Sequence, residues 1–397
     1  MTRAMNSQKW VLFLKINLGV FVLFILQGCN SSQKQDKEHL VFKYNEHSNI
    51  ATLDPAFARN PQTIWPSNQL FNGLVQLDDQ LNIQPDIAKS WHINDSTYTY
   101  TFTLRDDVYF HKNKVFKKDS TRSVVAQDFV YSFDRLLSTE LASPGSWVFN
   151  AVQRYHAAND STLVIQLNKP FPAFLGLLSM RYCSVVPKEA IAYYGNDFRS
   201  NPVGTGPFRF KFWEENVKLV LRKNPMYFEK DTQGNRLPYL EAVAITFLPD
   251  KQSEFLQFAQ GNIDFMTGLD NSYKDEIITT KGTLQPKYKD RVQLITTPYL
   301  NTEYLGFFMG STTKEIVSPL IRQAINYGFD REKMVTYLRN GMGIAATHGF
   351  IPKGLAGFDS IQGYNYNPEK ARALINRYKQ ATGATSIQVT IGTNSQY

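Results

Sequence analysis

The histidines and cysteines of this 397-residue chain do not occur at spacings that would hold a metal ion or build a nucleophilic site. No two histidines are four residues apart, and Cys183 has no neighbouring cysteine. The sequence also contains neither a Gly-x-Ser-x-Gly nucleophile elbow nor a Gly-x-x-x-x-Gly-Lys phosphate loop. The histidines are His39, His47, His92, His111, His156 and His348. We therefore expect no metal site, no cofactor and no enzymatic activity.

Two other patterns that could do chemistry have a simpler interpretation. The carboxylate pairs Asp78-Asp79 and Asp106-Asp107 stand in turn-like contexts, which favours solvated loops over an acid/base couple. Gly204-Thr205-Gly206 begins like a dinucleotide fingerprint, but Arg209 takes the third glycine's place and Pro207 lacks the N–H that phosphate would need. We predict that Gly204 to Phe208 forms a tight crossover turn.

The N-terminus has the order of a secretory signal. Positive charges at Arg3, Lys9 and Lys15 precede an apolar run from Ile16 to Leu26, which is too short for a membrane-spanning helix. The following Leu26-Gln27-Gly28-Cys29 resembles a bacterial lipoprotein box, in which the cysteine thiol receives a diacylglycerol and becomes the new N-terminus. Residues 1–28 are then a signal peptide, Cys29 is the lipid attachment site, and the polar residues 29–39 form a tether. An ordinary signal with an incidental cysteine is the alternative.

Composition excludes several classes of protein. Hydrophobic residues make up 43% and charged residues 20% of the chain, as in ordinary globular proteins. The formal charge of +8 falls to about +5 without the three basic signal residues, too little to indicate nucleic-acid binding. Two cysteines exclude a disulfide scaffold.

Strand-like and helix-like segments alternate along the rest of the chain. We predict strands over 40–44, 98–104, 217–222, 243–247 and 387–391. Apolar residues at helical spacing predict helices over 125–137 and 252–259, the second ended by Gly261. Asp330 is expected to cap a helix through Leu338, and Asn367-Pro368 to begin one that ends at Gly383. The pattern indicates an α/β protein.

Several short motifs, in order, resemble the extracellular solute-binding proteins of dipeptide, oligopeptide and nickel ABC importers (family 5). The most specific of them is Asn201-Pro202-Val203-Gly204-Thr205-Gly206-Pro207-Phe208. The others are Leu53-Asp54-Pro55, Leu70-Phe71-Asn72-Gly73-Leu74-Val75, Pro85-Asp86-Ile87-Ala88-Lys89-Ser90-Trp91, the segments 98–108 and 126–135, Gly261-Asn262-Ile263-Asp264, Arg322-Gln323-Ala324-Ile325-Asn326 and Tyr366-Asn367-Pro368-Glu369-Lys370-Ala371. The resemblance extends from Leu40 to the end of the chain.

The resemblance implies a two-lobed periplasmic-binding-protein fold of type II, in the large peptide-binding class, whose lobes close on a ligand. Lobe one would combine 40–64 with 181–269, a subdomain would be inserted at 65–180, and lobe two would span 270–397. Members of the family continue beyond this length, so we expect lobe two to be incomplete here and the 397 residues alone to bind peptide poorly. Cys183 is expected to be buried in a crossover strand.

The resemblance also implies ligand contacts. The positions that match the cleft loop after the Asp-Pro motif are Ala58, Arg59 and Asn60, where Arg59 could pair with a ligand carboxylate or lie in solvent. Trp147 matches an aromatic stretch near the pocket, although it could equally be a core residue. Asn301 and Tyr304 match the entry into lobe two.

The function implied is that of a lipid-anchored receptor on the periplasmic side of the envelope. It would be a monomer that captures short peptides and delivers them to an ABC permease and its ATPase. Another ligand (a nickel chelate, haem or an oligosaccharide) remains open, because a fold does not fix its ligand. An envelope chaperone or adhesin with the same fold is the alternative outside transport, and no nucleic-acid partner is expected.

Overall fold

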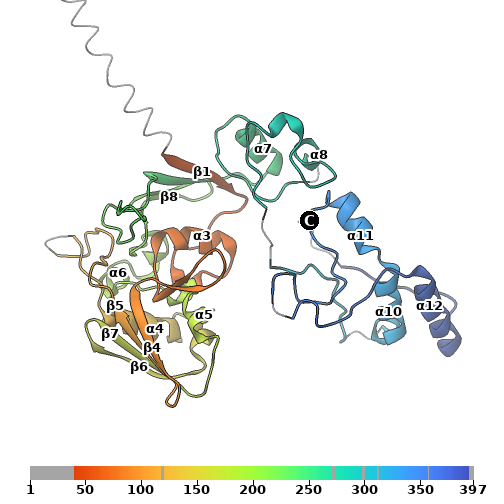
Figure 1. Ribbon diagram of the computed structural model, residues 1–397, viewed down its shortest axis with the longest axis horizontal. Coiled ribbons are helices and arrows are strands. Elements are labelled where there is room, and N and C mark those ends of the chain that lie inside the picture. The colour runs from red at the N-terminus through yellow and green to blue at the C-terminus, as the bar shows by residue number, and fades with distance from the viewer. Residues whose placement is uncertain are drawn as a thin grey trace, which may run out of the picture. The chain divides into compact units, whose positions relative to one another are not determined.

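The computed structural model describes residues 40–117, 120–270, 273–296, 300–310, 313–355 and 357–392. The chain divides into two compact units, one ending at Thr267 and the other beginning at Gly268 (Figure 1). The predicted signal peptide, the tether and Cys29 lie outside the described residues. Among the helices of the described ranges, none is both long enough and apolar enough to span a bilayer.

The first sheet of unit one joins the start of the chain to a segment two hundred residues later. Its order is β1-β10-β9-β8, with β1 (Val41–Glu46) parallel to β10 (Ala242–Phe247). The other two strands, β9 (Lys218–Lys223) and β8 (Phe208–Glu214), pair antiparallel. The predicted strands over 40–44, 217–222 and 243–247 are therefore confirmed. After β10, helix α7 (Lys251–Ala259) is capped by Asp250 and followed by Gly261 at φ 76°, which also confirms the predicted helix.

The second sheet of unit one has four antiparallel strands and a helix packed on it. Its order is β4-β5-β7-β6, formed by β4 (Ala88–Asn94), β5 (Thr99–Leu104), β7 (Thr162–Leu167) and β6 (Val152–Asn159). The alternation predicted for 98–104 appears as alternating burial along β5. Helix α4 (Ala126–Leu137) packs on β6 and β7, and its Phe129 and Phe133 are fully buried, as their helical spacing predicts.

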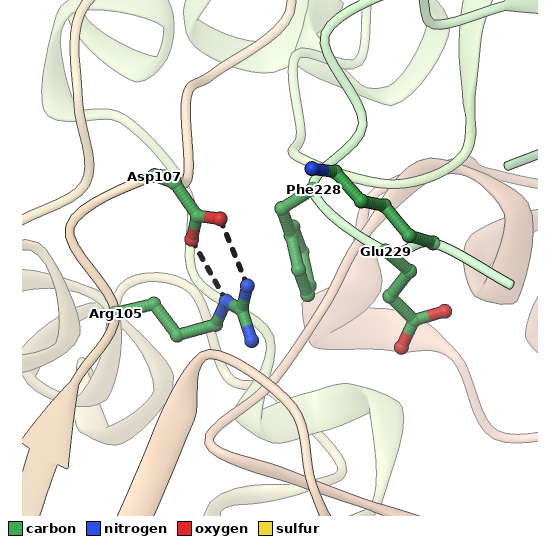
Figure 2. Close-up of a pocket in the computed structure, with 5 residues that line it drawn as sticks. Arg105, Asp107, Phe228 and Glu229 are labelled. Carbon is green, nitrogen blue, oxygen red and sulfur yellow. Dashed lines mark hydrogen bonds and ion pairs between the residues drawn. The ribbon is translucent and has the colours of Figure 1, made fainter. Parts of the chain in front are cut away.

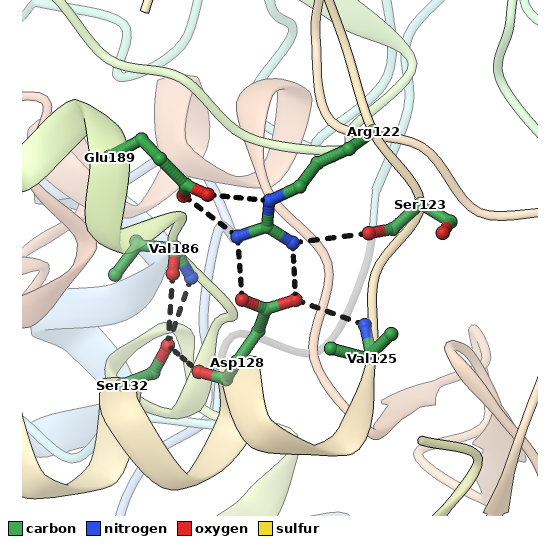
Figure 3. A network of polar contacts seen from close by, with 7 residues as sticks. All are labelled: Arg122, Ser123, Val125, Asp128, Ser132, Val186 and Glu189. Carbon is green, nitrogen blue, oxygen red and sulfur yellow. Dashed lines mark hydrogen bonds and ion pairs between the residues drawn. The ribbon is translucent and has the colours of Figure 1, made fainter. Parts of the chain in front are cut away.

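A charged network connects the start of α4 to helix α6 (Lys188–Tyr194). The Arg122 guanidinium donates two hydrogen bonds of 2.8 Å to Asp128 and two of 2.8 Å to Glu189, as Figure 3 shows. Asp128 also accepts from the Val125 backbone N–H at 3.0 Å, which caps a helix whose N-cap valine has no polar side chain. This network holds the loop before α4 in place.

One continuous core connects both sheets of unit one. The cluster of buried apolar residues runs from Tyr44 to Phe247 and includes β5, α4 and β7 as well as β9 and β10. Helix α3 (Pro61–Leu70) crosses the predicted boundary between lobe one and the inserted subdomain. The remaining elements of unit one are short: η2 (Pro55–Phe57), the hairpin β2 (Val75–Leu77) and β3 (Ile83–Pro85), η3 (Ser146–Phe149), α5 (Phe174–Leu178), η4 (Arg181–Cys183) and η5 (Gly195–Ser200). The division of this unit into lobe one and a subdomain stays a prediction.

The glycine-rich motif packs tightly against the end of α3. A Cβ on Gly204 would lie 2.0 Å from the carbonyl oxygen of Leu70, so only glycine fits. The Gly206 N–H donates to the same oxygen at 2.9 Å, and the Gly204 N–H donates to Nδ1 of His111 at 3.3 Å. The predicted tight turn is not present, because the structure has only a bend at Gly206 and Pro207, just before β8 begins at Phe208. Both glycine N–H groups are already used, which agrees with the rejection of a phosphate cradle.

Two other motifs meet inside unit one. The buried Asp86 accepts from Asn72 Nδ2 at 2.9 Å and from the Gly73 N–H at 3.0 Å, and burial raises its pKa to about 7. Thr205 donates to Asn72 Oδ1 at 2.9 Å. Cys183 is fully buried, as predicted, but it lies in the 3-10 helix η4 and not in a strand. The buried residues of these motifs therefore hold neighbouring segments of unit one together.

The named elements of unit two are all helices among its described residues. Its largest contact joins α10 (Pro319–Gly328) to α12 (Pro368–Thr382), and the residues buried there are Ile321, Ala324, Ala371, Leu374 and Tyr378. Asn367 caps α12 and Gly383 ends it at φ 71°, as predicted. The other helices are α8 (Lys274–Ile277), η6 (Pro286–Tyr288), α9 (Lys314–Val317), α11 (Arg331–Lys333) and the π-helical η7 (Met334–Leu338).

Two predictions for unit two need comment. Asp330 caps α11 by accepting from the Lys333 N–H at 2.9 Å, which confirms the cap, although the helix beyond it widens to a π-helix. The predicted strand over 387–391 is wrong, because these residues have no regular structure. The residue types in this segment favour a strand, but a strand also needs a neighbouring strand to pair with its backbone N–H and C=O groups.

Candidate functional site

The candidate site in unit one begins with a buried ion pair. Asp54 accepts from the Ala56 N–H at 3.1 Å and so caps η2, which Pro55 begins. Arg135, from α4, forms a bidentate pair with the same carboxylate, one of whose bonds is Nη1 to Oδ1 at 3.0 Å. Both side chains are largely buried. The pair therefore fixes the loop after the Asp-Pro motif to the neighbouring helix.

Arg59 stands on this fixed loop and faces solvent. Its backbone N–H donates to Phe57 O at 2.9 Å, and Asn60 begins α3 by accepting from the Thr63 N–H at 3.1 Å. Among the described residues, the Arg59 side chain has no hydrogen-bond or ion-pair partner. Ala58, in contrast, is buried. Of the three predicted loop residues, Arg59 and Asn60 therefore expose their side chains and Ala58 does not, and a ligand role for all three stays a prediction.

The turn that carries Trp147 lies against this loop. Ser143 Oγ donates to the Ala56 carbonyl at 2.6 Å and accepts from the Gly145 N–H at 3.0 Å. Trp147, on η3, is 46% exposed, so it is not a core residue. The structure thus places the predicted residues Arg59, Asn60 and Trp147 on neighbouring segments of one unit.

Tyr182 joins the two segments and was missed by sequence reasoning. A Cβ on Gly145 would lie 2.3 Å from the Tyr182 ring, so the tyrosine packs directly against the turn. Burial raises the pKa of Tyr182, and the positive charge of Arg59 partly opposes this rise. Nothing in the local sequence could identify Tyr182, because its neighbours come from positions 59 and 145.

Trp65 was missed as well. It projects from α3, is 40% exposed, and meets the ring of Tyr44 edge-on at 6.5 Å between centroids. The sequence shows only a tryptophan five residues after the Asn60 of Asn60-Pro61, a helix start that could have been recognised, and it does not show that the ring is exposed. A cation, an amide and exposed aromatic rings are the groups that bind a carboxylate and an extended backbone.

Asn301 and Tyr304 belong to unit two, and both are exposed there. Tyr304 is 70% exposed and meets the Phe350 ring at 4.9 Å between centroids. Thr302 Oγ1 donates to the Phe350 carbonyl at 2.8 Å, which ties this segment to the loop that carries Phe350. A ligand role for these two residues stays a prediction.

A cavity in unit one lies apart from these residues. It measures about 480 Å³ and is lined by Arg105, Asp107, Phe228, Glu229 and Lys230, none of them a predicted ligand residue. Figure 2 shows the Arg105 guanidinium bonded to Asp107, beside the Phe228 ring. Glu229 accepts from Gln76 Nε2 at 2.9 Å. Since two cations face two carboxylates, the lining has no net charge with which to select a ligand.

No group of three or more histidine, cysteine, aspartate or glutamate side chains within the described ranges could hold a metal ion. Burial accounts for the shifted side chains near the first sheet. It raises the pKa of Glu46 and the pKa of Glu254 to about 7 each, and lowers the pKa of His47, whose Nε2 lies 3.1 Å from Glu254.

The chain is similar to a large group of bacterial proteins. The family model described as bacterial extracellular solute-binding proteins, family 5 Middle, matches residues 82–396. Glutathione-binding protein GsiB of Salmonella typhimurium is 25% identical over 328 residues, which cover 83% of this chain and 59% of the relative. Heme-binding protein A of Haemophilus influenzae is 29% identical over 326 residues, covering 78% of this chain and 56% of the relative. The chain thus spans less than two thirds of the length of these relatives.

Solved structures share the fold. The periplasmic binding protein DppA of Helicobacter pylori, in complex with the peptide STSA, superposes with a TM-score of 0.70 at 24% identity, covering 85% of this chain and 66% of that one. The murein tripeptide binding protein MppA of Escherichia coli gives 0.68 at 24% identity, covering 86% and 66%. These likenesses confirm the predicted α/β fold of the peptide-binding class of periplasmic binding proteins.

Proposed function

Because the chain belongs to the bacterial extracellular solute-binding proteins of family 5, we propose that it captures short peptides and delivers them to an ABC permease. The observation that carries the peptide assignment is Arg59, an exposed cation without a carboxylate partner among the described residues, on a loop fixed by the Asp54–Arg135 pair. The exposed Trp147 on the adjoining turn supplies an apolar surface. The C-terminal carboxylate of a peptide would pair with Arg59, while the aromatic ring would pack on its backbone or side chains.

The similar proteins support a small organic ligand that carries charge. By their names, those found here bind glutathione, the peptide STSA and a murein tripeptide. Haem is the second candidate, since the relative named Heme-binding protein A is 29% identical to this chain. A haem carries carboxylates that the same arginine could bind, so the two ligands must be separated by experiment.

The test is calorimetric titration of the purified gene product with di- to pentapeptides, and with haem. Loss of one partner from a mostly desolvated charged pair costs about 2–5 kcal/mol. We therefore expect Arg59→Ala to weaken peptide binding at least tenfold. The matched control is Arg154→Ala, which removes an exposed arginine of β6 whose Nε bonds Gln166 on the same sheet.

The outcomes separate the alternatives. Unchanged peptide affinity in Arg59→Ala would assign this arginine to the solvated loop. Saturable binding of haem without binding of any peptide would replace the ligand but keep the receptor. Binding of neither, together with the absence of permease and ATPase genes beside this one, would favour an envelope chaperone or adhesin.

We further propose that the receptor is a monomer held by lipid on the periplasmic side of the envelope. Cys29 follows a short apolar run and a glycine, and residues 30–38 are polar enough to act as a tether. Cys29→Ser should release the protein from membranes or leave it unprocessed. If this variant fractionates and migrates like the parent, the lipid anchor is refuted.

A further inference from the structure

A small cavity in unit one has a cationic lining and lies apart from the predicted ligand residues. It measures about 80 Å³, which is more than a single water molecule needs. Its charged side chains are Lys112 and Arg209, and the amides of Asn113 and Asn201 and the hydroxyl-bearing Tyr194 complete the polar part. No carboxylate lines it. Such a lining favours an anion of a few heavy atoms.

The strand register places a second arginine directly beside the first. Arg209 of β8 is opposite Arg222 of β9, so their Cβ atoms lie about 4.5–5.5 Å apart. The same row continues through Ala242 of β10 to Val41 of β1, and therefore contains two positive charges and no negative one. Like charges in directly opposite positions destabilise a sheet.

Among the described residues, the strand register gives neither arginine an acidic neighbour. The diagonal neighbours of Arg209 on β9 are Val220 and Asn224, and that of Arg222 on β8 is Lys211. Both arginines are exposed, and neither forms an ion pair with a described residue. By contrast, Lys218 at the other end of β9 is opposite Glu214. The uncompensated pair is therefore confined to the end of the sheet that adjoins the cavity.

Two further side chains near the cavity, Lys114 and His111, bear on its net charge. Lys114 extends the positive charge, with its Nζ 4.9 Å from the centre of the Tyr193 ring and 5.8 Å from that of Tyr194. The buried His111 does not add to it. Its Nδ1 accepts from Gly204, so Nε2 carries the hydrogen and donates to the Gly206 carbonyl at 3.0 Å. Burial, and to a lesser degree Arg209, lowers the pKa of this imidazole to about 4, so it is neutral at physiological pH.

We propose that this cavity is a binding site for a phosphate-type oxyanion, held by Arg209, Arg222 and Lys112. The planar guanidinium groups would donate paired hydrogen bonds to the anion oxygens, and the amide of Asn113 would add a neutral donor. A bound dianion would also remove the repulsion between the two arginines, so binding and stability are coupled. The same chemistry occurs in free phosphate and in the headgroup of an anionic phospholipid.

The test is calorimetric titration of the protein with inorganic phosphate at low, constant ionic strength, with thermal melts alongside. Phosphate should bind saturably and raise the melting temperature. Because Arg209 would donate charge-assisted hydrogen bonds to the anion, Arg209→Gln should weaken binding roughly tenfold or more. Arg222→Gln should weaken it too, while raising the melting temperature without phosphate. Lys169→Gln, which removes an exposed lysine after β7, is the control and should bind like the parent.

Several results would overturn the site. Phosphate binding that is equal in Arg209→Gln and the parent would refute it, as would no saturable binding by the parent. If Arg209→Gln does not fold, Arg209→Lys replaces it, because lysine keeps the charge but loses the paired hydrogen bonds. The phosphate affinity of Arg209→Lys should be lower than that of the parent and higher than that of the double variant Lys112→Gln/Arg222→Gln. An affinity for Arg209→Lys equal to the parent's would contradict guanidinium recognition.

A second arm identifies the source of the anion. Flotation with vesicles of phosphatidylglycerol or of phosphatidylcholine would use the Cys29→Ser protein, with and without Arg209→Gln. Retention on the anionic vesicles alone, lost in Arg209→Gln, assigns a lipid phosphate. Phosphate binding without such retention assigns a soluble anion.

Discussion

The buried pair of Asp54 and Arg135 makes a sharp prediction about the stability of unit one. Asp54→Ala removes both the cap of η2 and the only carboxylate that pairs with Arg135 among the described residues. It leaves a guanidinium that is 11% exposed without its counter-charge. Breaking a buried pair from one side costs about 3–5 kcal/mol, because the remaining charge stays desolvated.

The free energy of unfolding should therefore fall by about 3–5 kcal/mol in Asp54→Ala. For a unit of this size each kcal/mol shifts the melting temperature by about 2–4 °C, so the melt should move down by roughly 6–20 °C. Tryptophan fluorescence isolates the effect, since Trp65, Trp91, Trp147 and Trp213 all lie in unit one and no tryptophan follows them.

A double-mutant cycle with Arg135→Met supplies the control. Methionine keeps much of the volume and removes the charge, so the double variant has no stranded ion in the core. Its loss of stability should be smaller than the sum of the two single losses by about 1–3 kcal/mol. A loss below about 1 kcal/mol in Asp54→Ala, or additive losses in the cycle, would refute the reasoning, because either result describes a pair that solvent already screens.

Two other substitutions test particular contacts. Gly204→Ala should destabilise unit one by about 1–3 kcal/mol or more, because its Cβ would meet the Leu70 carbonyl at 2.0 Å, whereas Gly176→Ala, in open space on α5, should be neutral or stabilising in the same melts. Burial raises the pKa of Glu254 and of Glu46 to about 7 from 4.5, so the stability that each contributes is complete below pH 4.5 and is lost as pH rises toward 7. Glu254→Gln should therefore make the fall in stability between pH 5 and 7 shallower, by up to about 1.4 kcal/mol per pH unit, and an unchanged slope would show that Glu254 is ionised throughout.

Local patterns in the sequence predicted the elements whose causes are local. The apolar spacing in α4 and the Asn-Pro start and Gly end of α12 each act within a few residues, and the structure has both helices. The strand expected at 387–391 failed for the opposite reason, since alternation cannot supply a pairing partner. The turn expected at Gly204 failed because the surface that shapes it, the end of α3, is more than a hundred residues away.

The candidate site divides in the same way. The loop with Arg59 was predicted from a local motif. Arg135, which holds this loop through Asp54, lies 81 residues after Asp54, and Tyr182 comes from a third segment of the chain. A sequence shows residue types at each of these positions, but the pairing of positions far apart depends on the fold as a whole.

The partners of the arginines distinguish the structural ones from those that can bind a ligand. Arg122 and Arg135 each meet carboxylates with paired hydrogen bonds and would have to break these contacts before they could bind anything else. Arg59 is exposed, with no such contact among the described residues, so a ligand carboxylate would bring the first counter-charge to it. Arg209 is also exposed and has no carboxylate partner among the described residues. Because it is repelled by Arg222, binding of an anion there is more favourable still. Arg59 and Arg209, which both lack an ion-pair partner among the described residues, thus stand at two separate places on unit one, and we expect the first to bind the solute and the second an oxyanion.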